Sequence, residues 1–337
     1  MCNREHLVLK TCRIQLKGVV SDKTREKVEQ ALEKYHYVEN KNARNLAMNR
    51  QYTIGYVGFR SRSSAYFSPE VRKGLERAIR EFGDDGLNIL ISEFDVHSPM
   101  QQMAAVDQML REGVRSFVLA FSDTEVIRQI LEKLKKLKCL VVLLSRDLQE
   151  NTGNHYVGVD YSQSGVLAAE LLGKMLPQGG SIFVPVTEEY LTNRDIQHRL
   201  NAFLTKMQEF PSCEVLPVVH GLTEEEEIRR EVKGAIAKHK DLAGIFDLTY
   251  RLDVVADVLR EEGREDLRLT GFDLYPEIME DVQDSLIDAV VYQDLNKQAY
   301  EGMKLLFEEM CYGKQLSEKK HYSKLEVVMS SNLSYFR

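Results

Sequence analysis

The stretch that decides the fold is residues 115–145, RSFVLAFSDTEVIRQILEKLKKLKCLVVLLS. Its two ends, 115–121 and 139–145, are nearly continuous apolar runs, which are typical of strands in a parallel sheet covered on both faces. The segment between them, 123–138, has apolar residues at helical spacing. Its basic run 131–138, LEKLKKLK, could be a nucleic-acid-binding stripe, but we favour the exposed face and last turn of an ordinary amphipathic helix. The stretch therefore predicts a strand–helix–strand unit.

The same alternation extends in both directions along the chain. We predict further strands at 52–59, 87–94, 181–187, 214–220, 244–249, 268–273, 288–293 and 324–329. We predict further helices at 69–82, 99–112, 162–176, 193–209, 223–239, 252–263, 276–284 and 296–312. The alternation restarts after residues 155–160, which indicates an α/β chain with two lobes, each a doubly wound parallel sheet. Ligands bind beside the carboxyl ends of strands in such sheets, so the cleft between the lobes is the expected pocket.

Charge is distributed unevenly along the 337 residues, whose net charge is −7. Residues 1–50 hold 11 Lys and Arg against 6 Asp and Glu, a net charge of +5, and the remainder holds 34 against 46, a net charge of −12. A basic segment on an acidic body suggests one part that meets a polyanion, although chance clustering would also produce a difference of this size. We favour a nucleic-acid contact for the basic segment.

Cysteine usage and hydropathy indicate the compartment. The five cysteines are widely spaced and include no CxxC pair, which fits reduced thiols better than a disulfide framework or a zinc site. We find no signal-peptide pattern at the N-terminus and no apolar run of the ~20 residues that cross a bilayer. We therefore expect a cytoplasmic protein without a membrane partner.

Two helices are predicted in the basic segment. The first spans 21–37, where Ser21 can cap the helix and Asp22 suits its positive end. The second, at 43–48, has few apolar residues and could not be stable alone. We expect it to become ordered only against a partner or a second copy of itself.

The sequence lacks the motifs that are typical of enzyme active sites. The sequence contains no GxGxxG, GxxxxGK(S/T), GxSxG or HExxH pattern, and its eight histidines are scattered. Nothing in the sequence pairs a nucleophile with a base. We therefore predict a protein that is not an enzyme, with no catalytic residue, no metal site and no cofactor.

The candidate ligand contacts are polar residues at strand ends or on a helix and two aromatic residues in the loop after the first strand. The polar residues are Arg146, Arg199, Asp273 and Gln293, and the aromatic residues of the loop are Tyr66 and Phe67. Charged and amide groups give directed hydrogen bonds to hydroxyls, and aromatic faces pack on the C–H surface of a sugar ring. For each arginine considered alone, the alternative to a ligand contact is an ion pair at the protein surface. Asp273 could instead cap the next helix.

Residues 20–59, VSDKTREKVEQALEKYHYVENKNARNLAMNRQYTIGYVGF, resemble the last headpiece helix, hinge helix and first body strand of the lactose-repressor/galactose-repressor (LacI/GalR) family. The segments LLSRD, HRLNAF, TGFDLYPE and IDAVVYQD resemble members whose sensor domain is similar to ribose-type sugar-binding proteins. The resemblance implies a two-lobed, type I periplasmic-binding-protein-like fold behind a small α-helical headpiece. It implies a headpiece and hinge at 1–50 and a sensor domain at 52–337. The sensor would have one lobe at about 52–157 and 293–318, and a second at about 158–292 and 319–337.

The resemblance also implies roles for individual residues. Leu46 matches the hinge leucine that wedges into the minor groove of an operator, and Asn40 and Ala43 match the hinge positions beside it. Tyr66, Phe67, Arg146, Arg199, Asp273 and Gln293 match ligand contacts of the sugar-binding relatives. The segment before residue 20 is about ten residues shorter than the register requires, so we expect an incomplete helix-turn-helix.

Two further departures from the family pattern concern single positions. Glu39 stands where the family has proline, and GIFDLTYR lacks the asparagine that relatives place after that strand.

The leading hypothesis is a homodimeric transcription regulator, a repressor that binds operator DNA and senses a small-molecule effector, a sugar or polyol, in the inter-lobe cleft. The alternative is a cytoplasmic sugar-binding sensor that does not bind DNA. A periplasmic transport receptor fits less well, because we find no export signal and a basic hinge would have no purpose there.

Overall fold

The computed structural model describes residues 51–61, 65–148, 153–188, 193–314 and 318–336. The predicted helices at 21–37 and 43–48, together with Asn40, Ala43 and Leu46, lie outside the described residues.

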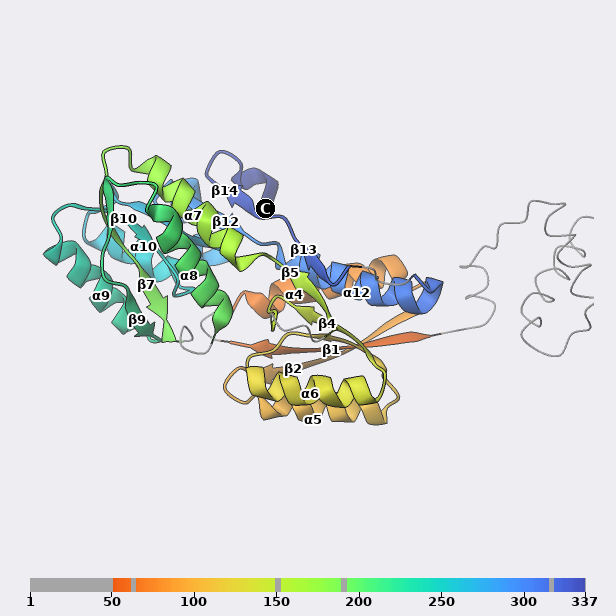
Figure 1. Cartoon of the computed structure of the whole chain (residues 1–337). Helices are drawn as coiled ribbons and strands as arrows, with labels where there is room; N and C mark the ends of the chain where they lie inside the picture. Colours follow the sequence, from red (N-terminus) through yellow and green to blue (C-terminus); the bar gives the residue numbers. More distant parts are fainter. Residues whose placement is uncertain (1–50, 62–64, 149–152, 189–192, 315–317, 337) are drawn as a thin grey trace, which may run out of the picture.

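The first lobe is built on a parallel sheet with strand order β13-β5-β4-β3-β1-β2. Its strands are β1 (Tyr52–Arg60), β2 (Leu87–Asp95), β3 (Ser116–Leu119), β4 (Leu140–Leu144), β5 (His155–Gly158) and β13 (Lys320–Tyr322). Helices α4 (Phe67–Phe82) and α12 (Leu295–Tyr312) pack together on one face, and α5 (Met100–Arg111) and α6 (Thr124–Lys136) lie on the other (Figure 1).

The strand–helix–strand unit predicted from residues 115–145 is confirmed as β3, α6 and β4. Every residue of β3 is buried, which explains its continuous apolar sequence. Asp123 caps α6 by accepting hydrogen bonds from the backbone N–H groups of Glu125 and Val126, at 2.9 and 2.8 Å. The buried face of α6 includes Leu131 and Leu134, and lysines fill its last turn. The run 131–138 is therefore an amphipathic helix end.

The second lobe is built on a sheet with strand order β14-β12-β11-β10-β6-β8. Its strands are β6 (Gly180–Phe183), β8 (Cys213–Val215), β10 (Leu242–Phe246), β11 (Arg268–Phe272), β12 (Ala289–Tyr292) and β14 (Glu326–Val328). Its helices are α7 (Tyr161–Met175), α8 (Arg194–Met207), α9 (Glu225–Lys238), α10 (Leu252–Glu261) and α11 (Met279–Gln283), with the 3₁₀ turns η2 (Pro276–Ile278) and η3 (Leu333–Phe336).

Alternate residues of the central strands supply two apolar cores on opposite faces of the second sheet. Ile245 and Leu269 belong to the core beneath α9 and α10, whereas Phe246 and Phe272 belong to the core beneath α7 and α8. Successive side chains of a strand point to opposite faces, so a strand covered on both sides must be apolar throughout. The predicted α/β fold with two doubly wound lobes is thus confirmed.

Several predicted boundaries differ from the structure. The strands predicted at 181–187 and 214–220 each divide into two, and β7 (Pro185–Thr187) and β9 (Val219–Leu222) pair in a separate small sheet. Proline has no N–H to donate, so Pro185 and Pro217 interrupt the ladders. The last strand, β14, is antiparallel to β12 and not parallel.

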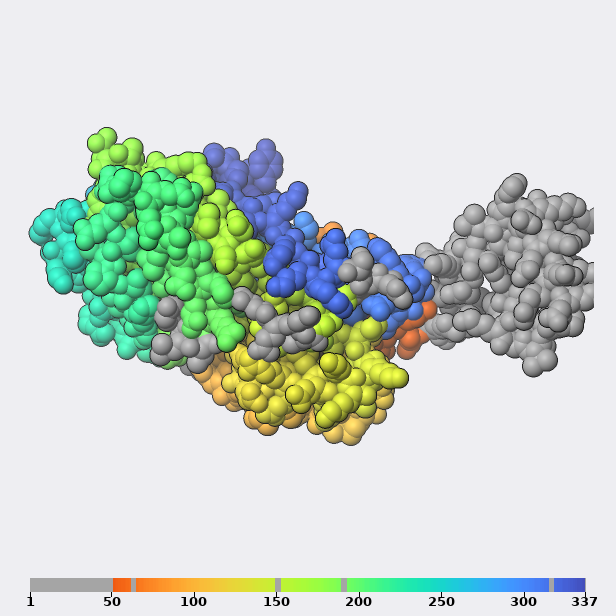
Figure 2. All heavy atoms as spheres, viewed as in Figure 1, coloured from red at the N-terminus to blue at the C-terminus, as the bar shows by residue number. Residues whose placement is uncertain are grey.

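The expected return to the second lobe at residue 319 is also wrong. Residues Lys320, His321 and Tyr322 pair with Tyr156, Val157 and Gly158 of β5, so β13 still belongs to the first sheet. The chain crosses between the lobes after β5, after β12 and after β13. Figure 2 shows the first lobe (orange and yellow) in contact with the second (green and cyan).

Candidate functional site

A polar cavity lies between the two lobes, at the carboxyl ends of their strands. Its water-accessible volume is ≈ 50 Å³, several times the roughly 10–15 Å³ that one water molecule requires. All six predicted ligand contacts line it: Tyr66, Phe67, Arg146, Arg199, Asp273 and Gln293. Seven further residues complete the lining: Phe59, Ser145, Tyr161, Asn193, Asp195, Tyr250 and Leu295. The structure thus brings the six together, and their contact with a ligand stays a prediction.

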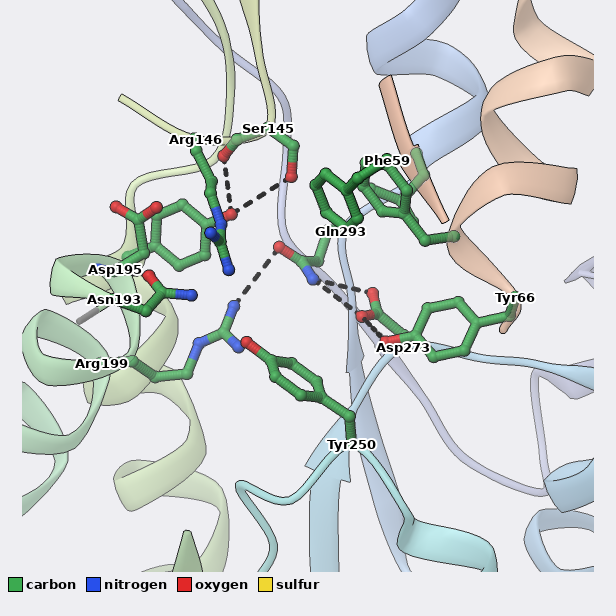
Figure 3. Close-up of a pocket in the computed structure, with 13 residues that line it drawn as sticks. Phe59, Tyr66, Ser145, Arg146, Asn193, Asp195, Arg199, Tyr250, Asp273 and Gln293 are labelled. Atoms are coloured by element: carbon green, nitrogen blue, oxygen red, sulfur yellow. Dashed lines mark hydrogen bonds between the residues drawn. The ribbon is translucent and has the colours of Figure 1, made fainter. Parts of the chain in front are cut away.

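A chain of hydrogen bonds crosses the floor of the cleft from Arg199 to Asp273 (Figure 3). Arg199 Nη2 donates to Gln293 Oε1 at 3.3 Å, and Gln293 Nε2 donates to both carboxylate oxygens of Asp273 at 2.8 and 2.9 Å. Gln298 donates from its Nε2 to the backbone carbonyl of Gln293 at 2.8 Å. All four side chains are buried, so these partners replace water.

Asp273 joins the two lobes. It follows β11 in the second lobe with φ of 65°, and its Oδ2 accepts a hydrogen bond from the Tyr66 hydroxyl of the first lobe at 2.6 Å. The Tyr66 ring also stacks on Tyr275 of the second lobe, with centroids 4.9 Å apart. Burial raises the pKa of Asp273, and the hydrogen bond from Tyr66 opposes that rise. The alternative that Asp273 caps the next helix is wrong, because both its oxygens face Tyr66 and Gln293 and Tyr275 precedes that turn.

Arg199 is buried on α8, with 1% of its surface exposed. Its guanidinium carbon lies 3.5 Å from the Phe272 ring centroid and 4.9 Å from that of Tyr161, and its Nε donates to Ser164 Oγ at 3.0 Å. Aromatic faces and neutral acceptors therefore hold this guanidinium at the wall of the cavity. The alternative of a surface ion pair is therefore wrong for Arg199.

The first lobe supplies an aromatic wall beside a second arginine. Arg146 follows β4, donates from Nη1 to the Ser122 carbonyl at 3.2 Å, and lies 5.6 Å from the Phe59 ring centroid. Phe59 stacks on Phe67 with centroids 4.6 Å apart and planes 9° apart. Phe67 belongs to the first turn of α4 and not to the loop where we expected it, because the helix begins two residues before Pro69.

A second hydrogen bond between the lobes lies on this side of the cleft. Tyr161, the first residue of α7, donates from its hydroxyl to the Ser145 carbonyl of the first lobe at 2.6 Å. Ser145 has φ of 66°, which turns its carbonyl toward the second lobe. The lobes are thus in contact at both ends of the cavity.

Asp195 is the main residue that sequence reasoning missed. It lies in the first turn of α8, one turn before Arg199, and only 4% of its surface is exposed. Burial raises its pKa to about 7, although Arg146 and Arg199 act in the opposite direction. The i, i+4 spacing to Arg199 was the available signal, since such residues share a helix face. Phe59 and Ser145 were also missed, although they lie at strand ends as Arg146 does.

The cleft offers binding groups and shows no catalytic pairing of a nucleophile with a base among its described residues. Across the ranges that the structure describes, no three His, Cys, Asp or Glu side chains are grouped as metal ligands. In the same ranges, no helix is long and apolar enough to cross a membrane. A cleft between two doubly wound lobes, lined by donors and acceptors of both, defines a two-lobed ligand-binding protein.

Comparison with known families agrees with this class. The chain belongs to the periplasmic binding protein domain family, whose profile matches residues 54–315. Among curated protein sequences, none is significantly similar to this chain.

Solved structures with the same fold include both regulators and transport proteins. A provisionally named LacI transcriptional regulator from Bacteroides fragilis is 17% identical, with a TM-score of 0.74 over 86% of this chain and 100% of its own. A Bacillus halodurans transporter solute-binding protein with bound myo-inositol is 17% identical, with a TM-score of 0.73 over 85% of this chain and 97% of its own. A Burkholderia graminis solute-binding protein in complex with D-arabinose is 18% identical, with a TM-score of 0.73 over 84% and 96%.

Proposed function

We propose that this protein is a ligand-responsive, DNA-binding transcription regulator, a repressor that senses a small sugar or a related polyol. The observation that carries the proposal is the convergence of charged, amide and aromatic side chains from both lobes in one cleft. These groups suit a polyhydroxylated ring, because hydroxyls take directed hydrogen bonds and the C–H faces of a sugar pack on aromatics. The inositol-bound and arabinose-bound relatives, and the LacI regulator, share this fold.

Lobe closure is the proposed response to the ligand. Tyr66 meets Asp273 and Tyr275 across the cleft, and Tyr161 meets Ser145, so a ligand between the lobes would compete with these contacts or add to them. A ligand that favours one lobe arrangement shifts the equilibrium by its differential affinity. Coupling between sensor and DNA sites is typically about 1–3 kcal/mol, which would change operator affinity roughly 5- to 150-fold.

The DNA-binding part of the proposal rests on residues 1–50, whose net charge of +5 contrasts with the acidic body. Leu46 is the proposed wedge in the minor groove, with Asn40 and Ala43 beside it. A homodimer in the cytoplasm would place two such hinges on a pseudo-palindromic operator. Ile79 on α4 and Ile91 on β2 are each 41% exposed and offer apolar surface to a second copy.

Thermal-shift and gel-shift measurements test the two parts separately. We expect a pentose, hexose or inositol to raise the melting temperature, and Arg146→Ala and Asp273→Ala to abolish that rise without unfolding the chain. Retention of the full rise in both variants would refute the assigned pocket. With DNA from upstream of its own gene at low salt, we expect a specific complex whose affinity changes with the same ligand.

Leu46→Ala is the matched control for the DNA arm, because it should weaken the complex while the ligand-induced thermal shift stays unchanged. A Leu46→Ala chain that binds DNA as well as the wild type would contradict the role of the hinge.

The second candidate function is a cytoplasmic sugar-binding sensor that does not bind DNA. The observation that favours it is the structural similarity to two transport solute-binding proteins. The similarity extends over 97% and 96% of their chains. A chain that binds a sugar but forms no specific DNA complex, with or without that sugar, would establish this candidate in place of the repressor.

A further inference from the structure

The last turn of α6 carries more positive charge than that of any other described helix. Lys133, Lys135 and Lys136 lie in that turn. The last turns of α4, α7, α8 and α10 contain one basic residue each, and a carboxylate pairs with every one of these four. One cation near the negative end of the helix dipole is therefore the ordinary complement in this fold, and Lys133, which pairs with Asp107, already provides it. The dipole of α6 does not account for the other two lysines.

Five exposed cations gather at the ends of α5 and α6 and have no carboxylate partner among the described residues: Arg111, Arg115, Lys135, Lys136 and Lys138. We call this surface the basic end of the first lobe. Arg115 donates hydrogen bonds to the carbonyls of Leu110 and Val114, at 3.1 and 2.7 Å, so no carboxylate offsets its charge. Glu112 and Glu132 lie on the same helix ends, which leaves a net charge of +3. Cations of the second lobe, by contrast, form a network of ion pairs on α9 and α10.

The basic end lies beside the point at which the N-terminal segment joins the body. Strands β1, β3 and β4 are parallel neighbours, so they begin at the same edge of the sheet (Figure 1). Neighbouring strands are about 4.8 Å apart, which places Lys138, just before β4, on the order of 10 Å from the line of β1. Residues 1–50, with their net charge of +5, enter at this edge. Asp84 and Asp85 precede β2 on the other side of β1, so the positive charge is confined to the side of α5 and α6.

We propose that the basic end of the first lobe is a second DNA-contact surface, which binds phosphates of the duplex beside the stretch that the N-terminal hinge occupies. The inference rests on the proposed DNA-binding function and extends it from residues 1–50 to the sensor body. Unpaired lysines and arginines neutralise phosphates and release their counterions, which adds affinity without sequence preference. The distance from β1 is comparable to the Debye length of about 8 Å at physiological salt, so these charges act on DNA held by the hinge.

Fluorescence anisotropy with a labelled duplex from upstream of the protein's own gene, titrated between about 50 and 200 mM salt, tests this contact. Lys135→Gln and Lys136→Gln together remove two charges and leave the buried face of α6 intact. Each lost phosphate contact makes the slope of log K against log salt shallower by about 0.9. We expect the double variant to have a slope shallower by about 1–2 and to bind roughly 8- to 60-fold more weakly near 0.1 M salt. Its circular dichroism spectrum and melting temperature should match those of the wild type.

Lys238→Gln combined with Lys240→Gln is the matched control. Both lysines are exposed at the end of α9, just before β10, as Lys135 and Lys136 lie before β4. The strands of both lobes run toward the cleft, so β10 begins at the opposite end of the molecule from β1 (Figure 1). This control variant should retain the wild-type slope and the wild-type DNA affinity.

An unchanged slope in the α6 double variant, or an equal change in both double variants, would overturn the inference. It would also be overturned if the α6 variant kept its DNA affinity but lost binding to vesicles of anionic lipid, which would assign the surface to a membrane. If the wild-type protein formed no complex with DNA even at low salt, the proposed DNA binding itself would fail together with the inference. The two failures are thus distinguishable.

Discussion

Asp195→Asn is expected to stabilise the chain, and to do so more strongly at pH 8 than at pH 5. Burial raises the pKa of the Asp195 carboxyl from 3.8 to about 7 in the folded protein. Between those pH values the folded chain retains a proton that the unfolded chain has released. The unfolding free energy therefore falls as the pH rises from about 4 to 7. Above that range the loss of unfolding free energy caused by Asp195 is constant.

The magnitude follows from the two pKa values. At about 1.36 kcal/mol for each pH unit by which they differ, ionisation of Asp195 removes about 2–3 kcal/mol of unfolding free energy between pH 5 and pH 8. Asparagine has no such equilibrium. The unfolding free energy of the variant relative to wild type should therefore rise by about the same 2–3 kcal/mol over this interval.

Urea unfolding followed by far-ultraviolet circular dichroism at pH 5 and pH 8 measures this difference, since the chain has no tryptophan to report by fluorescence. Asp266→Asn is the control: Arg264 lowers the pKa of this carboxyl, so it is ionised in both states at both pH values. Its effect should be the same at pH 5 and pH 8. An equal effect of Asp195→Asn at the two pH values would refute the raised pKa of this buried carboxyl.

Three further substitutions test the contacts of the cleft and of the helices behind it. Tyr66→Phe removes the inter-lobe hydrogen bond to Asp273, so calorimetry should show roughly 2- to 10-fold tighter polyol binding; weaker binding would mean that the hydroxyl itself contacts the ligand. Arg199→Met keeps an apolar contact but loses the charged donor, and should weaken the same ligand at least about tenfold, so unchanged affinity would contradict its role. Gly165→Ala would place a Cβ 2.0 Å from the Arg199 carbonyl, where α7 packs on α8, and should cost about 1–3 kcal/mol in urea unfolding. Gly234→Ala meets no atom within 4 Å and should stabilise by about 0.5–1 kcal/mol, so equal effects of the two alanines would disprove the close helix contact.

Local sequence patterns were enough to predict the fold class and the edge of the sheets at which the cleft lies. Continuous apolar runs such as LVVLL in β4 can only be buried on both faces, and the α6 pattern places its apolar residues on one side. Both are local signals, each contained within a single strand or helix. They also showed that Arg146, Asp273 and Gln293 end strands, which brings them to one edge whatever the strand order.

Strand pairing and the contacts between distant residues could not be predicted from local patterns. Residues 320–322 join the first sheet because their backbone groups pair with β5, and no side-chain pattern in so short a strand predicts that partner. Tyr66 and Asp273 are 207 residues apart in the chain, and their hydrogen bond depends on how the lobes pack. The pKa of Asp195 depends likewise on burial between lobes and on charges from both. Such properties arise from distant segments brought together in a region of low dielectric constant, which a local sequence pattern cannot encode.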